Sequence, residues 1–125
     1  MTTLAEDRDA IRDLYARYCH CVDGGAAEEW AQLFTDDGRF LTGGDPLVGR
    51  EALRAFAAAL PAGTMHHLVT DLAIDVEGDR AACRSSVLVM ANGAIMIAGR
   101  SSDELQRVDG SWRIANRDFV ADATA

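Results

Sequence analysis

The sequence predicts an α+β fold in which helices pack against a mainly antiparallel, curved sheet. Three observations lead to this prediction. Three segments within residues 4–60 have helical patterns, and residues from 66 onward form four strand-like runs. The turns between those runs are Gly-Asp, Asn-Gly and Asp-Gly pairs, which are typical of hairpins. Helices first and strands afterwards are characteristic of the α+β class. A curved sheet folded around a helix encloses a pocket, where we expect the function to reside.

The first helix is predicted over residues 4–22. Its apolar residues recur mostly three or four positions apart, which places them on one face. Two consecutive glycines, Gly24 and Gly25, end the helix. Charged residues occupy the other face, where we expect exposure to solvent; they are Asp7, Arg8, Asp9, Arg12, Asp13 and Arg17.

Shorter elements fill the middle of the chain. A second helix is predicted over residues 26–34, and the polar stretch 35–42 turns into a short strand. A third helix begins after Gly49 and stops at Pro61. The four strands that follow are predicted over residues 66–76, 81–91, 94–108 and 111–120.

The bulk composition excludes several classes of protein. The 125 residues suit one domain, residues 1–125, and carry 20 acidic and 12 basic side chains, a net charge of −8. Nucleic-acid binding is therefore not expected. The chain has no run of about 18 apolar residues, so no membrane span is expected. The acidic N-terminal stretch lacks an apolar core, so we expect no signal peptide and a cytoplasmic location.

Cofactor and metal sites are not expected either. The glycines lack the spacing of a dinucleotide or phosphate loop. His66, His67 and Asp71 are close in sequence, but adjacent strand residues diverge and no second ligand cluster appears. The cysteines are odd in number and are expected to be reduced packing residues; they are Cys19, Cys21 and Cys83.

Asp23 is the informative carboxylate. It follows Cys19 by four residues and Tyr15 by eight, so it continues the apolar face of the first helix. A carboxylate buried there needs a partner, and a histidine across the cavity would serve as one. That pair would act as a general base. The alternative is a polar residue that merely solvates the turn at the helix end. Tyr18 shares the face, either as a hydrogen-bond donor to a substrate oxygen or as a core residue.

The adjacent histidines of "MHHLVTD" pose the second question. His66 and His67 must point to opposite faces of a strand. In a flat strand His66 shares its face with the more apolar residues, but a bulge near Thr70 and Asp71 would exchange the faces midway. The pattern alone does not decide which of the two histidines faces inward.

The whole pattern resembles the SnoaL-like branch of the NTF2-like superfamily. The resemblance is carried by "AIRDLYARYCHCVDGG", "GREALRAF", "HHLVTDLAIDVEGDRAACRSSV" and "DELQRVDGSWRIANRDF". It implies a cone, in which a strongly curved sheet wraps the helices around a deep pocket, in a homo-oligomer (dimer or trimer). Within the superfamily the chain looks most like scytalone dehydratase and hexachlorocyclohexane dehydrochlorinase, which use an Asp–His dyad.

That resemblance assigns residues. The dyad falls on Asp23 and His67, and the pocket arginine of the dehydrochlorinase falls on Arg117, which would stabilise a developing anion or else be a surface strand residue. The lysine of the dehydrochlorinase falls on Tyr18, and the second histidine of the dehydratase falls near Ser85. These departures argue against either enzyme's own substrate.

The expected function is a cofactor-independent lyase or isomerase, dehydratase-like, acting on a small hydrophobic organic molecule, such as a polyketide-like metabolite. Two alternatives stay open at this point. One is a non-catalytic ligand-binding or assembly module of the same fold. The other is a polyketide cyclase or epoxide-opening enzyme.

Overall fold

The computed structural model describes residues 1–123 and has the expected order of elements, helices first and a long antiparallel meander afterwards. Within those residues no helix is long and apolar enough to cross a membrane. The elements are α1 (Leu4–Asp23), α2 (Ala27–Gln32), β1 (Phe34–Leu41), β2 (Leu47–Val48), α3 (Arg50–Ala58), β3 (Met65–Glu77), β4 (Arg80–Ala91), β5 (Ala94–Val108) and β6 (Ser111–Ala121).

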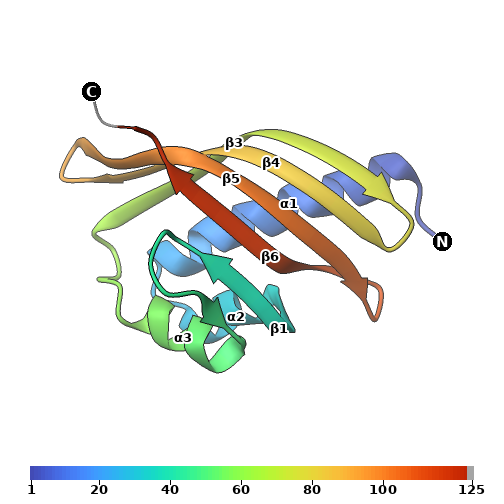
Figure 1. Ribbon diagram of the computed structural model, residues 1–125, viewed down its shortest axis with the longest axis horizontal. Coiled ribbons are helices and arrows are strands. Elements are labelled where there is room, and N and C mark those ends of the chain that lie inside the picture. The colour runs from blue at the N-terminus through green and yellow to red at the C-terminus, as the bar shows by residue number, and fades with distance from the viewer. Residues whose placement is uncertain (124–125) are drawn as a thin grey trace.

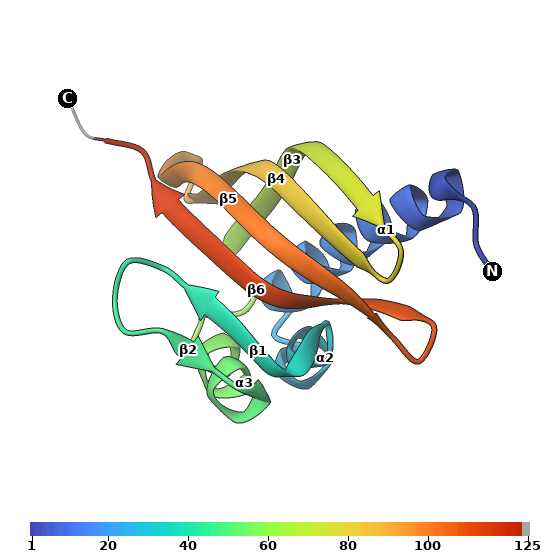
Figure 2. The same ribbon diagram turned by 45° about the vertical axis from the view of Figure 1, so that its right-hand side comes forward.

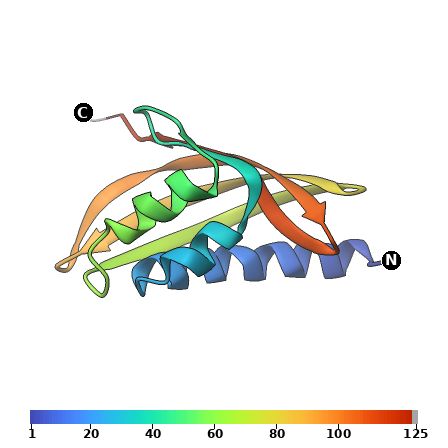
Figure 3. The ribbon, with the colours of Figure 1, turned by 90° about the horizontal axis from the view of Figure 1, so that it is seen from below.

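The six strands form one curved, unclosed sheet in the order β2-β1-β6-β5-β4-β3. All neighbours are antiparallel except β1 and β6, which are parallel. The four long strands run side by side, with β1, β2 and α3 beyond β6 (Figures 1 and 2). Seen from below, all three helices lie on one side of the sheet, which curves over them (Figure 3). The α+β prediction is therefore confirmed, and the core lies between the helices and the concave face.

Helix α1 has a defined start and end. The Thr3 side chain accepts a hydrogen bond from the Glu6 backbone N–H, and the Glu6 carboxylate accepts one from the Thr3 backbone in return. This capping box stabilises the first turn. The helix ends at Asp23, and Gly25 adopts a left-handed conformation with φ of 78°. Asp23 therefore stands on the last turn of the helix.

The second helix is shorter than predicted. It ends at Gln32, and Phe34 is the first residue of β1 instead of the last of the helix. Tertiary contacts decide this: the backbone N–H of Ile114 in β6 donates to the Leu33 carbonyl. The Phe34 ring packs 5.0 Å from that of Trp30. The two-residue strand β2 was not predicted at all, because its only partner is β1.

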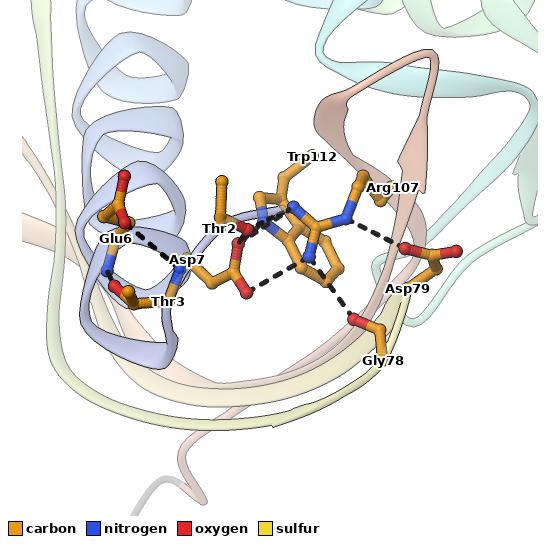
Figure 4. Close-up of polar contacts among 8 residues, drawn as sticks. All are labelled: Thr2, Thr3, Glu6, Asp7, Gly78, Asp79, Arg107 and Trp112. Atoms are coloured by element: carbon orange, nitrogen blue, oxygen red, sulfur yellow. Dashed lines mark hydrogen bonds and ion pairs between the residues drawn. The ribbon is translucent and has the colours of Figure 1, made fainter.

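Asp7 is buried, although the helical pattern placed it on the solvated face. Its carboxylate accepts two hydrogen bonds from Arg107 and one from the indole N–H of Trp112 (Figure 4). Arg107 also donates to Asp79 in the β3–β4 turn. Arg107 and Trp112 lie 100 and 105 positions from Asp7, so no local pattern could identify them. The contacts tie the start of α1 to two hairpins.

Strand β3 contains an irregularity of the expected kind. Its pairing with β4 shifts between Thr70 and Ala73, so that two residues face one on β4. Asp71, inside the bulge, has φ of 53°. A bulge of this type exchanges the faces of a strand. His67 before it and Ile74 after it consequently both lie on the helix side of the sheet.

Candidate active site

A cavity of about 370 Å³ lies between the concave face of the sheet and helices α1 and α3. Most of its wall is apolar, which suits a small organic ligand. Three of its polar side chains, Tyr18, His67 and Arg117, come from α1, β3 and β6. The remaining lining residues are Val22, Phe40, Thr42, Phe56, Leu60, Val87, Val89, Ile97 and Phe119.

Asp23 and His67 are paired by three hydrogen bonds. The Asp23 Oδ1 atom lies 2.6 Å from His67 Nδ1. The two carboxylate oxygens also accept from the His67 backbone N–H, at 2.9 and 3.1 Å. His67 lies on β3, the edge strand of the sheet, where an N–H group that faces outward has no strand to pair with. One carboxylate therefore holds both the main chain and the ring of the histidine.

The pairing determines which ring nitrogen faces the cavity. A carboxylate can only accept hydrogen bonds, so Nδ1 of neutral His67 carries the proton. Nε2 is then the unprotonated nitrogen, on the side of the ring away from Asp23. His67 lines the cavity while Asp23 lies behind it. The geometry leaves a basic lone pair available to a bound ligand, with a negative charge behind the ring to stabilise its protonated form.

The other histidines do not take part in this arrangement. His66, the neighbour of His67, is exposed, and so is His20 on α1. Cys19 is one turn before Asp23, but burial raises the pKa of its thiol to about 11. Since the thiolate is the nucleophilic form, Cys19 is not suited to covalent catalysis.

Arg117 is fully buried and belongs to a polar cluster that the sequence did not reveal. Its Nη1 atom donates to Asp103 Oδ2 at 2.5 Å. The same carboxylate accepts from the Tyr15 hydroxyl and from the Ser101 hydroxyl, each at 2.5 Å. Asp103 shares its strand parity with Ser101 and with the buried Leu105, and this was the one signal that could have identified it.

Tyr18 lies against Arg117 at the cavity wall. The guanidinium carbon is 4.7 Å from the centre of the Tyr18 ring, a cation–π distance. Burial raises the pKa of Tyr18, so its hydroxyl stays protonated and can donate a hydrogen bond. Burial opposes the charge on Arg117, but the pKa of the guanidinium is nevertheless raised, with the charge and the hydrogen bond of Asp103 among the causes. The cavity thus has a hydrogen-bond donor wall and a basic nitrogen.

The structure brings all four predicted site residues to one place: Asp23 and His67 as a pair, and Tyr18 and Arg117 as another. Within residues 1–123, no group of three or more His, Cys, Asp or Glu side chains is placed to hold a metal ion. On β5, Ile97 lines the cavity and its neighbour Met96 is exposed.

Comparisons with known proteins agree with this architecture. A family profile described as "SnoaL-like domain" matches residues 3–118. Rv3472, a protein of unknown function from Mycobacterium tuberculosis, is 38% identical with a TM-score of 0.89, over 94% of this chain and 77% of that one. An NTF2-like protein with a cystatin-like fold from Novosphingobium aromaticivorans is 28% identical (TM-score 0.89, 98% and 86% covered).

A third structure, from the same organism, is assigned provisionally as a scytalone dehydratase. It is 26% identical with a TM-score of 0.82, over 98% of this chain and 87% of that one. No curated protein matches the chain. These findings confirm the resemblance drawn from the sequence and the expected NTF2-like fold.

Proposed function

This chain belongs to the SnoaL-like domain family, and we propose that it is a cofactor-independent lyase or isomerase acting on a small, largely apolar molecule. The observation that carries the proposal is the His67 ring, which is held through Nδ1 by Asp23 and borders an apolar cavity. In a binding module, a charged pair at the edge of an apolar cavity would only cost desolvation, whereas a histidine base that removes a proton from carbon is oriented and strengthened by such a carboxylate.

The proposed reaction begins with proton transfer. His67 Nε2 takes a proton from a carbon of the substrate, and the imidazolium that forms is stabilised by Asp23. In an elimination, the electron pair of the C–H bond becomes a double bond while a leaving group departs from the adjacent carbon. If that group is a hydroxyl, His67 returns its proton to it and water is released. In an isomerisation, the proton returns to another carbon.

Tyr18 and Arg117 supply the complementary part of the proposal. A proton next to a carbonyl group is removed more readily when the oxygen that becomes negative is stabilised. The hydroxyl of Tyr18 and the guanidinium of Arg117 border the same cavity as His67. These two groups would donate hydrogen bonds to that oxygen as it becomes negative.

The test follows proton abstraction directly and needs no knowledge of the natural substrate. Wild-type protein is incubated with 1-tetralone in D₂O, and deuterium incorporation next to the carbonyl is followed by mass spectrometry. His67→Gln and Asp23→Asn should each slow the exchange by about 10²- to 10⁴-fold. His66→Gln is the matched control, because His66 is the exposed neighbour on the same strand, and it should leave the rate unchanged.

Two results would contradict the proposal. Exchange that survives His67→Gln would mean that another group is the base. Tight binding of tetralone and related ketones without any exchange would favour the second candidate, a ligand-binding module of the same fold. A panel of aromatic β-hydroxy ketones, followed by the absorbance of the enone product, then separates elimination from isomerisation.

A further inference from the structure

Asp103 is the centre of the buried cluster beneath the cavity. Its two oxygens accept hydrogen bonds from Arg117, Tyr15 and Ser101, and all four residues are at most 3% exposed. A buried carboxylate that accepts from three donors, one of them a guanidinium, is ionised and rigidly held. Arg117 therefore meets a full, fixed negative charge on one side.

The donors of the guanidinium are not all satisfied by the protein. Among the residues that the structure describes, Nη1 of Arg117 donates to Asp103, and Nε is buried without a hydrogen-bond partner. Aromatic rings of Tyr15, Tyr18 and Phe40 surround the group at 4.7 to 5.9 Å. Since Arg117 also lines the cavity, its remaining donors are available to an oxygen of a bound molecule.

The charges around the cavity disfavour an anionic ligand. Arg117 is held by the carboxylate of Asp103, and His67 is held by that of Asp23. Among residues 1–123, a carboxylate or phosphate in the cavity therefore finds no unpaired positive charge at this site, and both carboxylates repel it. A neutral ketone meets hydrogen-bond donors without that repulsion.

We propose that Asp103 is a specificity-determining and positioning residue: by neutralising and orienting Arg117, it makes the cavity selective for uncharged, carbonyl-bearing molecules over carboxylates. The inference rests on the proposed function in one respect: it assumes that the carbonyl oxygen of the substrate lies against Arg117 during proton transfer. During that transfer the new imidazolium pairs with Asp23 and the new enolate oxygen lies beside Arg117, so each charge that forms has a partner.

The experiment compares two ligands of the same shape, 2-acetylnaphthalene and 2-naphthoate, whose binding is measured by calorimetry at neutral pH. Wild-type protein should bind the ketone about tenfold more tightly than the carboxylate, or better. In Asp103→Asn the guanidinium loses its counter-charge, and the affinity for 2-naphthoate should rise about tenfold while that for the ketone changes little. A residue with a merely structural role would weaken both ligands.

The substitution is chosen to keep the cluster satisfied. In Asp103→Asn the new amide oxygen can accept from Tyr15 and Arg117. The new NH₂ group can donate to the Ser101 hydroxyl, whose single proton can then turn to the Asp118 carbonyl 3.3 Å away. Asp118→Asn is the matched control. Asp118 follows Arg117 directly in the sequence, so its side chain lies on the opposite face of β6. Its replacement also removes one negative charge and should leave the ligand preference unchanged.

Two results would overturn the inference. The first is tighter binding of 2-naphthoate than of 2-acetylnaphthalene by the wild-type protein. This test does not depend on whether the Asp103→Asn variant folds. The other is an Arg117→Met variant that keeps the wild-type preference for the ketone. Because no turnover is measured, the outcome is separate from that of the exchange assay: a selective cavity without exchange would refute the proposed reaction and retain this inference.

Discussion

Replacing Gly99 by alanine tests how closely β5 and β6 pack at the cavity wall. An ideal Cβ on Gly99 would lie 2.4 Å from the Val120 carbonyl oxygen and 2.7 Å from two atoms of the Phe119 ring. The carbonyl belongs to the paired strand and cannot move cheaply, so β6 must shift or the ring must turn into the cavity that it lines. Overpacking of this kind costs about 1–3 kcal/mol. For a chain of this length that corresponds to a decrease in Tm of about 3 to 15 °C.

The assay is urea unfolding followed by far-UV circular dichroism, with Gly44→Ala as the matched control. Gly44 has no heavy atom within 4 Å of its ideal Cβ and no left-handed φ. Its replacement should leave stability unchanged or raise it by up to about 1 kcal/mol, because alanine restricts the unfolded chain. Gly99→Ala should also weaken binding of ketones in the cavity. Equal stability of the Gly99→Ala and Gly44→Ala variants would refute the steric argument.

Three further predictions concern stability and reactivity. Hydrogen bonds from Arg107 hold the pKa of Asp7 below its ordinary 3.8, so this carboxylate stabilises the fold fully above that pH and less as the pH falls below it. In urea unfolding, Asp7→Asn should have a lower free energy of unfolding than wild type, and this difference should shrink as the solution is acidified. Asp9→Asn, at an exposed position, should have the same free energy of unfolding as wild type. Leu53→Ala removes a fully buried side chain and should lower the free energy of unfolding by about 2–5 kcal/mol; a smaller loss would mean that α3 repacks. Burial raises the pKa of Cys83 to about 11, so iodoacetamide at mildly alkaline pH should label Cys83 only in urea. Labelling of Cys83 in the native protein, located by peptide mass spectrometry, would contradict its burial.

The part of the site that the residue pattern itself singled out, Asp23, has a local signal, whereas His67 and Arg117 were assigned by the family resemblance. Asp23 extends a helical apolar face by one more turn, and that periodicity is set by the helix alone. The end of α1 follows an equally local rule, the glycine pair after Asp23. Nothing distant is needed to recognise such features.

The parts that were missed depend on partners far away in the chain. Asp7 sits on the charged side of its helix and is buried only because Arg107 and Trp112 reach it from β5 and β6. Strand parity places Asp103 on the same face as the buried Leu105, but its partner Tyr15 lies 88 positions earlier and does not follow from that pattern. The environment of a carboxylate in a strand of mixed polarity is created largely by other elements.

The choice between the two histidines shows how one backbone irregularity joins the fold to the site. Ile74 is 4% exposed and belongs to the core, so strict alternation from it along β3 would turn His66 inward and His67 outward. The bulge at Asp71 reverses this parity, and His67 and Ile74 share the helix side as a result. The edge position of β3 then leaves the His67 backbone N–H free to bind Asp23. A regular strand could bury the core residue or present the histidine to the aspartate, but not both, so the bulge is the feature on which the dyad depends.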